Sequence, residues 1–150
     1  MELKIGQEAP IKNFIDSTGN EFNLIGKKTV LYFYPKDNTP GCTAQACNLN
    51  ENLDYLTGKG FQVAGVSTDS AKSHDKFIAK YQLKFPLIAD ESHEIVEAFG
   101  VWVEKSMYGR KYFGIERTTF LIDPHGIIQR IWPKVTVTGH VETVLKAIKE

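Results

Sequence analysis

The chain has 150 residues, of which 42% are hydrophobic and 24% are charged, and its formal net charge at pH 7 is zero. This size and composition are typical of one globular domain, so we predict a single domain over residues 1–150. The balanced charge disfavours nucleic-acid and acidic-membrane partners, and the sequence contains neither a secretory signal pattern nor an apolar run of about 20 residues. We therefore expect a cytoplasmic protein, in which two cysteines indicate redox chemistry or a metal site rather than a permanent disulfide.

The predicted elements begin with a short hairpin over residues 9–24 that turns at residues 17–20. Residues 29–34 are β-branched and aromatic, which is typical of a buried central strand, and Pro35 ends this strand because it cannot donate to a ladder. After a loop, apolar residues at spacings of three and four predict one helical stripe. Its members are Cys42, Ala46, Leu49, Leu53 and Leu56.

The second part of the chain repeats the alternation of strands and helices. A strand is predicted at 61–67, a helix from about residue 70 to residue 81, and a short strand around 87–89. The next helix holds Ile95, Val96 and Phe99. Strands at 118–122 and 127–132 flank a turn at 123–126, and a closing helix carries Val141, Val144, Leu145 and Ile148.

This order of elements predicts an α/β protein with a thioredoxin-like fold, in which helices cover both faces of a central mixed β-sheet and a hairpin precedes it. The order of the strands within the sheet does not follow from the pattern.

The loop between the central strand and the first helix carries the strongest chemical signal. Thr39 is a favoured N-cap and Pro40 suits the first helical position, which places Cys42 in the first turn. Backbone N–H groups without helical partners and the helix dipole stabilise a thiolate there. A cysteine on an apolar stripe is often only a small buried hydrophobe, but the Thr-Pro-Gly turn before it favours Cys42 as a nucleophile.

Cys47 follows Cys42 by five residues. A regular helix would separate their Cα atoms by about 7.5 Å along its axis and turn them about 140° apart. A disulfide needs Cα atoms within about 7 Å and side chains that face each other. A bond between the two thiols therefore requires the first turns of the helix to unwind, which a C-x-x-C pair does not require.

A zinc site is disfavoured, because two thiols and no ligand-spaced histidine pair are present, and we predict neither a metal nor a cofactor. The histidines are scattered and are interpreted as surface or packing residues: His74, His93, His125 and His140. Arg117 opens the strand at 118–122. It is either an ordinary strand-end charge or a cation that points across the sheet end toward Cys42, and the sequence leaves both possibilities open.

The pattern Pro35-x-x-x-Thr39-x-x-Cys42 after an aromatic strand, together with the distant Arg117, resembles the peroxiredoxin family. The sequence around this pattern, residues 32–43, is similar to the sequences of the bacterioferritin-comigratory-protein (PrxQ) subfamily. Further matches extend the resemblance over nearly the whole chain, at residues 63–69, His74, Phe77, 85–87, Asp90, 99–101 and 117–123.

The resemblance implies a thiol-specific peroxidase that reduces hydrogen peroxide and organic hydroperoxides. Cys42 would attack the peroxide and become a sulfenic acid. Thr39 would hydrogen-bond the sulfur and the peroxide, Pro35 would shield the pocket from water, and Arg117 would hold the thiolate and polarise the O–O bond. Cys47 would resolve the sulfenic acid as an intramolecular disulfide. A thioredoxin-like dithiol would then reduce that disulfide, and we expect a monomer rather than a dimer.

One departure from the subfamily is visible. Where relatives often read Cys-Thr-x-Glu-x-Cys-x-Phe-Arg, this chain has Gln45, Leu49 and Asn50, so we expect altered hydrogen bonding near the pocket with activity retained.

Two other functions stay open. A thiol–disulfide oxidoreductase would reduce insulin better than it consumes peroxide. A redox-switched sensor or holdase would react slowly with peroxide and bind a partner only when oxidised.

Overall fold

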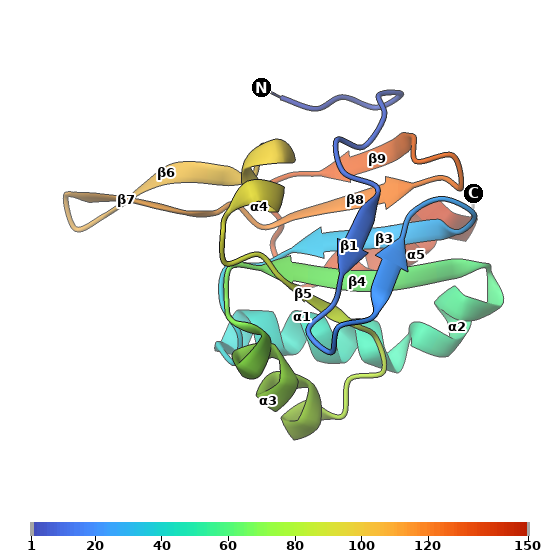
Figure 1. The fold of residues 1–150 in the computed structure, drawn as a ribbon, viewed down its shortest axis with the longest axis horizontal. Coiled ribbons are helices and arrows are strands. Elements are labelled where there is room, and N and C mark those ends of the chain that lie inside the picture. Colours follow the sequence, from blue (N-terminus) through green and yellow to red (C-terminus); the bar gives the residue numbers. More distant parts are fainter. Residues whose placement is uncertain (1, 150) are drawn as a thin grey trace.

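A mixed five-stranded sheet with the order β5-β4-β3-β8-β9 forms the centre of the molecule (Figure 1). The computed structural model describes residues 2–149. Strands β3, β4 and β5 are parallel, whereas β8 runs antiparallel to both β3 and β9. The strands of this sheet are β3 (Lys28–Phe33), β4 (Phe61–Ser67), β5 (Leu87–Ala89), β8 (Thr118–Ile122) and β9 (Ile128–Trp132). The predicted mixed sheet is confirmed.

The remaining elements cover this sheet on both faces or stand beside it. The helices are α1 (Pro40–Glu51), α2 (Leu53–Gly58), α3 (Ala71–Tyr81), α4 (Glu94–Ala98) and α5 (His140–Lys149). The predicted N-terminal hairpin is confirmed as β1 (Asn13–Ile15) and β2 (Glu21–Asn23), which pair antiparallel. Within residues 2–149 no helix combines the length and the apolar character that a membrane crossing requires.

Alternate side chains of β3 supply two buried clusters, one on each face of the sheet. Leu31 and Phe33 pack with residues of the N-terminal hairpin and α4. Val30 and Tyr32 pack on the opposite face with residues of α1, α2, α3 and α5. Because both of its faces are covered, β3 is buried along nearly its whole length, as its apolar sequence predicts.

The helix that follows the central strand is interrupted, which corrects the prediction of one continuous stripe. The stripe itself is buried at Cys42, Ala46, Leu49 and Leu56. Asn52, with φ −101° and ψ 7°, ends α1 and begins α2, and its side-chain amide donates to the carbonyl of Asn48. A side chain that bonds the backbone competes with the helical ladder at this position.

A second hairpin, formed by β6 (Trp102–Met107) and β7 (Arg110–Ile115), was not predicted. It projects away from the central sheet at the left of Figure 1. Tyr108 and Gly109 both have positive φ angles, as a two-residue hairpin turn requires. Most of its residues are exposed, including a Tyr108 side chain that is 99% accessible, so the burial pattern that identifies the other strands is weak here.

Candidate active site

Cys42 lies in the first turn of α1, at the end of the loop that leaves β3. Thr39 has an extended backbone and Pro40 is the first residue of the helix, as predicted. The first helical hydrogen bond joins the Thr43 amide to the Thr39 carbonyl, so the amides of residues 41 and 42 precede the helical ladder. Such amides can stabilise a negative charge close to the sulfur.

The hydroxyl of Thr39 does not cap the helix, although its position is that of an N-cap. The hydroxyl donates instead to the carbonyl oxygen of Lys36, which lies 2.9 Å from Thr39 Oγ1. A hydroxyl has one proton and two lone pairs, so the Thr39 oxygen keeps only acceptor capacity for a further partner.

Arg117 reaches Cys42 because of the strand register. Thr118 pairs with Phe33 in the antiparallel β3–β8 ladder, so Arg117 lies next to the point where the chain leaves β3 for the loop that leads to Cys42. Its Nη2 donates to the Cys42 sulfur at 3.3 Å. Of the two possibilities open for Arg117, the structure shows the one that points toward the cysteine.

Gly41 lies beside this contact. A Cβ at this position would lie 3.4 Å from Arg117 Nη2 and 3.9 Å from a methyl group of Val137, which are ordinary van der Waals distances.

Gln45 occupies the other branch of the guanidinium. Arg117 Nη1 donates to Gln45 Oε1 at 2.6 Å, and Gln45 is only 1% exposed. Arg117 is only partly buried, and this neutral amide satisfies one of its donors without cancelling its charge. The sequence identified Gln45 as a departure from relatives, and the structure places it in the site.

Asn50, another of the departures, is not part of the site. Its amide donates to the Gln82 carbonyl at 3.0 Å and its oxygen accepts from the Lys84 amide at 2.8 Å. Asn50 joins the end of α1 to the segment after α3, whereas Gln45 contacts Arg117.

Two buried donors close to the cysteine have no hydrogen-bond partner among residues 2–149: the Tyr32 hydroxyl and the Gln45 amide nitrogen. Burial raises the pKa of Tyr32, and the nearby Cys42 adds to this effect, so the phenol keeps its proton. Gly65 accommodates the Tyr32 ring, because a Cβ there would lie 2.8 Å from a ring carbon. Buried polar groups are normally hydrogen-bonded, so these two donors favour a polar ligand that accepts hydrogen bonds in the site.

Cys47 lies in the same helix, is half-buried, and like Cys42 is a free thiol. Burial raises the pKa of Cys47, and the nearby Glu51 raises it further, so the thiol is held in its protonated form. The unbroken helix from residue 40 to residue 51 leaves the two sulfurs in the arrangement that a disulfide cannot adopt.

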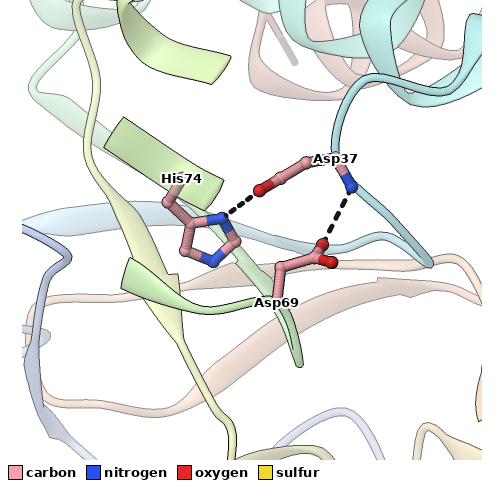
Figure 2. Close-up of side chains that lie close together, drawn as sticks. All are labelled: Asp37, Asp69 and His74. Carbon is pink, nitrogen blue, oxygen red and sulfur yellow. Dashed lines mark hydrogen bonds and ion pairs between the residues drawn. The ribbon is translucent and has the colours of Figure 1, made fainter. Parts of the chain in front are cut away.

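The ligand atoms of Asp37, Asp69 and His74 lie within 4.8 Å of one another, which makes them the candidate metal cluster of the described chain (Figure 2). His74 Nδ1 lies 2.7 Å from Asp37 Oδ2, and Asp69 Oδ2 accepts from the Asp37 amide at 2.8 Å. These are hydrogen-bond distances between the ligand atoms and their protein partners, so a cation would have to replace the bonds that now hold the loop. We interpret the cluster as a hydrogen-bonded network. The sequence treated His74 as a packing residue and did not identify this network.

The comparisons with known proteins agree over most of the chain. The model of the AhpC/TSA family matches residues 5–131. The chain is 47% identical over 148 residues to a putative peroxiredoxin Bcp of Coxiella burnetii, covering 97% of this chain and 98% of that protein. It is 43% identical to peroxiredoxin Bcp of Escherichia coli strain K12, covering 99% and 97%.

Solved structures are similarly close. A cysteine-to-serine variant of PrxQ from Xylella fastidiosa superposes with a TM-score of 0.92 at 38% identity, covering 99% of this chain and 97% of that chain. The bacterioferritin comigratory protein of Xanthomonas campestris, described in terms of its alkyl peroxide reduction activity, gives 0.88 at 41% identity, covering 98% and 96%. These neighbours confirm the predicted thioredoxin-like fold.

Proposed function

The chain belongs to the AhpC/TSA family and is a peroxiredoxin, a thiol peroxidase, and from that premise we propose that Cys42 is the residue that attacks the hydroperoxide. The observation that carries this assignment is the 3.3 Å contact between Arg117 Nη2 and the Cys42 sulfur at the start of α1. A guanidinium and unpaired helix-start amides around one sulfur favour the thiolate, which is the nucleophilic form.

In the proposed first step the Cys42 thiolate attacks the terminal oxygen of the hydroperoxide. An S–O bond forms, the O–O bond breaks, and the departing oxygen takes up a proton to give an alcohol or water. The partly buried Arg117 and the buried donors of Tyr32 and Gln45 support charge on that oxygen. Thr39 accepts a hydrogen bond from the peroxide because its own proton is donated to Lys36.

Pro35 shields the pocket in this proposal. It is the second residue after β3, is partly buried, and brings no N–H group that would need a water partner. A dry pocket strengthens the electrostatic effect of the guanidinium.

In the second step Cys47 attacks the sulfenic sulfur, an S–S bond forms and water leaves. The residues around Cys42 and Cys47 have to leave the helix for this step. A thioredoxin-like dithiol then supplies two electrons and two protons, which restores both thiols. We propose hydrogen peroxide and organic hydroperoxides as substrates, the latter supported by the alkyl peroxide reduction of the Xanthomonas relative. A cytoplasmic location and a monomeric state belong to the same proposal.

The test is stopped-flow peroxide consumption combined with mass spectrometry of the oxidised product. Cys42→Ser should abolish turnover, whereas Cys47→Ser should still form one sulfenic acid on Cys42 and lose thioredoxin-supported cycling. Turnover that persists in Cys42→Ser would refute the assignment of the nucleophile. An intact cycle in Cys47→Ser would show that the resolving thiol comes from elsewhere.

A further inference from the structure

The carboxylate of Asp37 is held from several sides in the loop between β3 and α1. Tyr34 donates its hydroxyl to Oδ1 at 2.5 Å, and Ser73 donates to Oδ2 at 2.8 Å. His74 Nδ1 lies 2.7 Å from the same Oδ2. Asp37 is 8% exposed and His74 is fully buried, so these bonds form away from water, where they are strong.

The proton count of this cluster can be read from its partners. His74 Nε2 lies 2.9 Å from the backbone carbonyl of Ile88, which can only accept, so this nitrogen carries a proton. Burial raises the pKa of Tyr34, so its hydroxyl is protonated and acts as the donor to Asp37. Burial alone would raise the pKa of Asp37, but the bonds from His74, Tyr34 and Ser73 outweigh it and the pKa is lowered. An ionised Asp37 carboxylate can only accept, so the geometry places an acceptor opposite each ring nitrogen of His74.

The network leads directly to the active site. Asp37 follows Lys36, whose carbonyl accepts the Thr39 hydroxyl, and it precedes Asn38. Asn38 has a left-handed φ of 60°, and its side-chain oxygen accepts from Tyr81 of α3 at 3.1 Å. Through Asp37 the loop is attached to α3 and to the connection that precedes α3 (Figure 2). At its other end, the Thr39 carbonyl accepts the first helical hydrogen bond of α1.

We propose that Asp37 and His74 form a buried carboxylate–imidazolium pair, and that His74 is a positioning residue which fixes the 35–39 loop, and with it Thr39, opposite Cys42. The proposal rests on Cys42 as the peroxide-reactive residue. The partners of Asp37 lie directly after β3, in the connection between β4 and α3, and on α3 itself, so the pair stays intact when α1 unwinds, and the loop returns each reduced Cys42 to the same geometry.

The first measurement is the nitrogen-15 NMR spectrum of the histidine rings in the reduced wild-type protein at pH 7. The titratable groups that face the His74 ring are Asp37 and Tyr34, with Asp69 bonded to the Asp37 amide. The pair predicts that both His74 ring nitrogens carry protons, and that Asp37→Asn removes this signature. A neutral His74 ring in the wild-type protein would overturn the proposal.

The second measurement separates loop geometry from thiol reactivity. His74→Gln should slow Cys42 oxidation by hydrogen peroxide by about tenfold to a hundredfold, because a displaced Thr39 no longer meets the peroxide. Alkylation of Cys42 by iodoacetamide needs the thiolate but not Thr39, so it should change by less than about threefold. An unchanged peroxide rate in folded His74→Gln would overturn the proposal, as would an equal loss in both reactions.

Two further variants keep this test decisive. Val96→Ala removes buried volume on the opposite face of the sheet and should leave both rates unchanged, which controls for general destabilisation. Removing one member of a buried charge pair is strongly destabilising, so the neutral double variant Asp37→Asn/His74→Gln should fold better and still show the slow peroxide reaction. A wild-type-like peroxide rate in it would refute the positioning role. If wild-type Cys42 itself reacted slowly with peroxide, the proposed function would fail whatever the NMR spectrum showed.

Discussion

Helices α1 and α3 each follow a parallel strand of the same sheet, yet their first turns are held in different ways. In α3 the Ser70 hydroxyl oxygen accepts from the Ser73 amide, and Lys80 lies in the last turn, where a cation is favourable. In α1 the Thr39 hydroxyl is directed to Lys36, and the described helix has neither an acid in its first turn nor a base in its last turn.

What holds the start of α1 instead is Arg117, a residue distant in sequence, whose two branches contact Cys42 and Gln45. The start of α3 therefore has a local side-chain cap besides its bonds to Asp37, whereas the start of α1 has no such cap and depends on a tertiary contact to the Cys42 sulfur. In the proposed mechanism, oxidation of Cys42 alters that contact directly, so α1 is the helix that oxidation can release.

The strongest test of this contrast is amide hydrogen exchange before and after oxidation. Formation of the Cys42–Cys47 disulfide should raise exchange in residues 43–51 by at least about a hundredfold, while α3 keeps its protection. Cys47→Ser treated with one equivalent of peroxide is the control, because it stops before the disulfide and should keep more protection in α1. Equal changes in both helices would contradict the comparison.

Arg117→Gln tests whether the contact between Arg117 and the Cys42 sulfur stabilises the start of α1 in place of a side-chain cap. Loss of the donor to the sulfur should lower the peroxide rate by about a hundredfold. It should also raise exchange in the first turns of α1 in the reduced protein, measured by the same hydrogen-exchange method. Arg110→Gln, at the exposed end of the β6–β7 hairpin, is the matched control and should change neither quantity. A slower enzyme with unchanged α1 exchange would separate catalysis from helix stability.

The thiol of Cys47 gives the contrast a pH dependence. Burial, with a smaller effect from Glu51, raises the pKa of Cys47 above its ordinary value of 9.0 while α1 is folded. Its contribution to helix stability is therefore complete below pH 9.0 and is lost as the pH rises through the folded pKa, so α1 should open more readily in alkaline solution.

Alkylation of Cys47 across pH in the Cys42→Ser protein measures this shift. Glu51→Gln should bring the apparent pKa part of the way back, and Glu94→Gln in α4 should not. An apparent pKa at or below 9.0 in Cys42→Ser would contradict the direction stated here.

The smallest expected effect comes from helix propensity. Asn48 lies between Cys47 and the end of α1, and Asn48→Ala should stabilise the helix by about 0.5 kcal/mol. Disulfide closure should then slow by about twofold in stopped-flow experiments, since the helix has to unwind first. Lys76→Ala in α3 is the control, and a faster closure in Asn48→Ala would refute the link between unwinding and closure.

The local parts of the site were predictable from the sequence because neighbouring residues determine them. An apolar strand, a proline that ends it and the Thr-Pro-Gly turn place Cys42 at a helix start without knowledge of the sheet. The Arg117 contact was only one of two possibilities, because it depends on the register that pairs Thr118 with Phe33.

The remainder required distances that no local pattern contains. The Asp37–His74 pair joins residues 37 positions apart, and it forms only because α3 returns against the loop after β3. The β6–β7 hairpin escaped prediction for the opposite reason, since its residues are mostly exposed and lack a buried face. The break at Asn52 was missed because the apolar stripe continues across it, and the spacing of apolar residues does not show the side-chain bond from Asn52 to Asn48.

Both thiols lie in one unbroken helix, so two reactions would compete for a Cys42 sulfenic acid in the proposed mechanism. A sulfenic acid on Cys42 meets either Cys47, after α1 has opened, or a second peroxide molecule, which converts it to the irreversible sulfinic form. Isolated helices relax in about 0.1–1 μs, and every contact that holds α1 in place lengthens that interval. The stability of α1, through its rate of opening, thus sets the peroxide concentration above which formation of the sulfinic acid inactivates the enzyme.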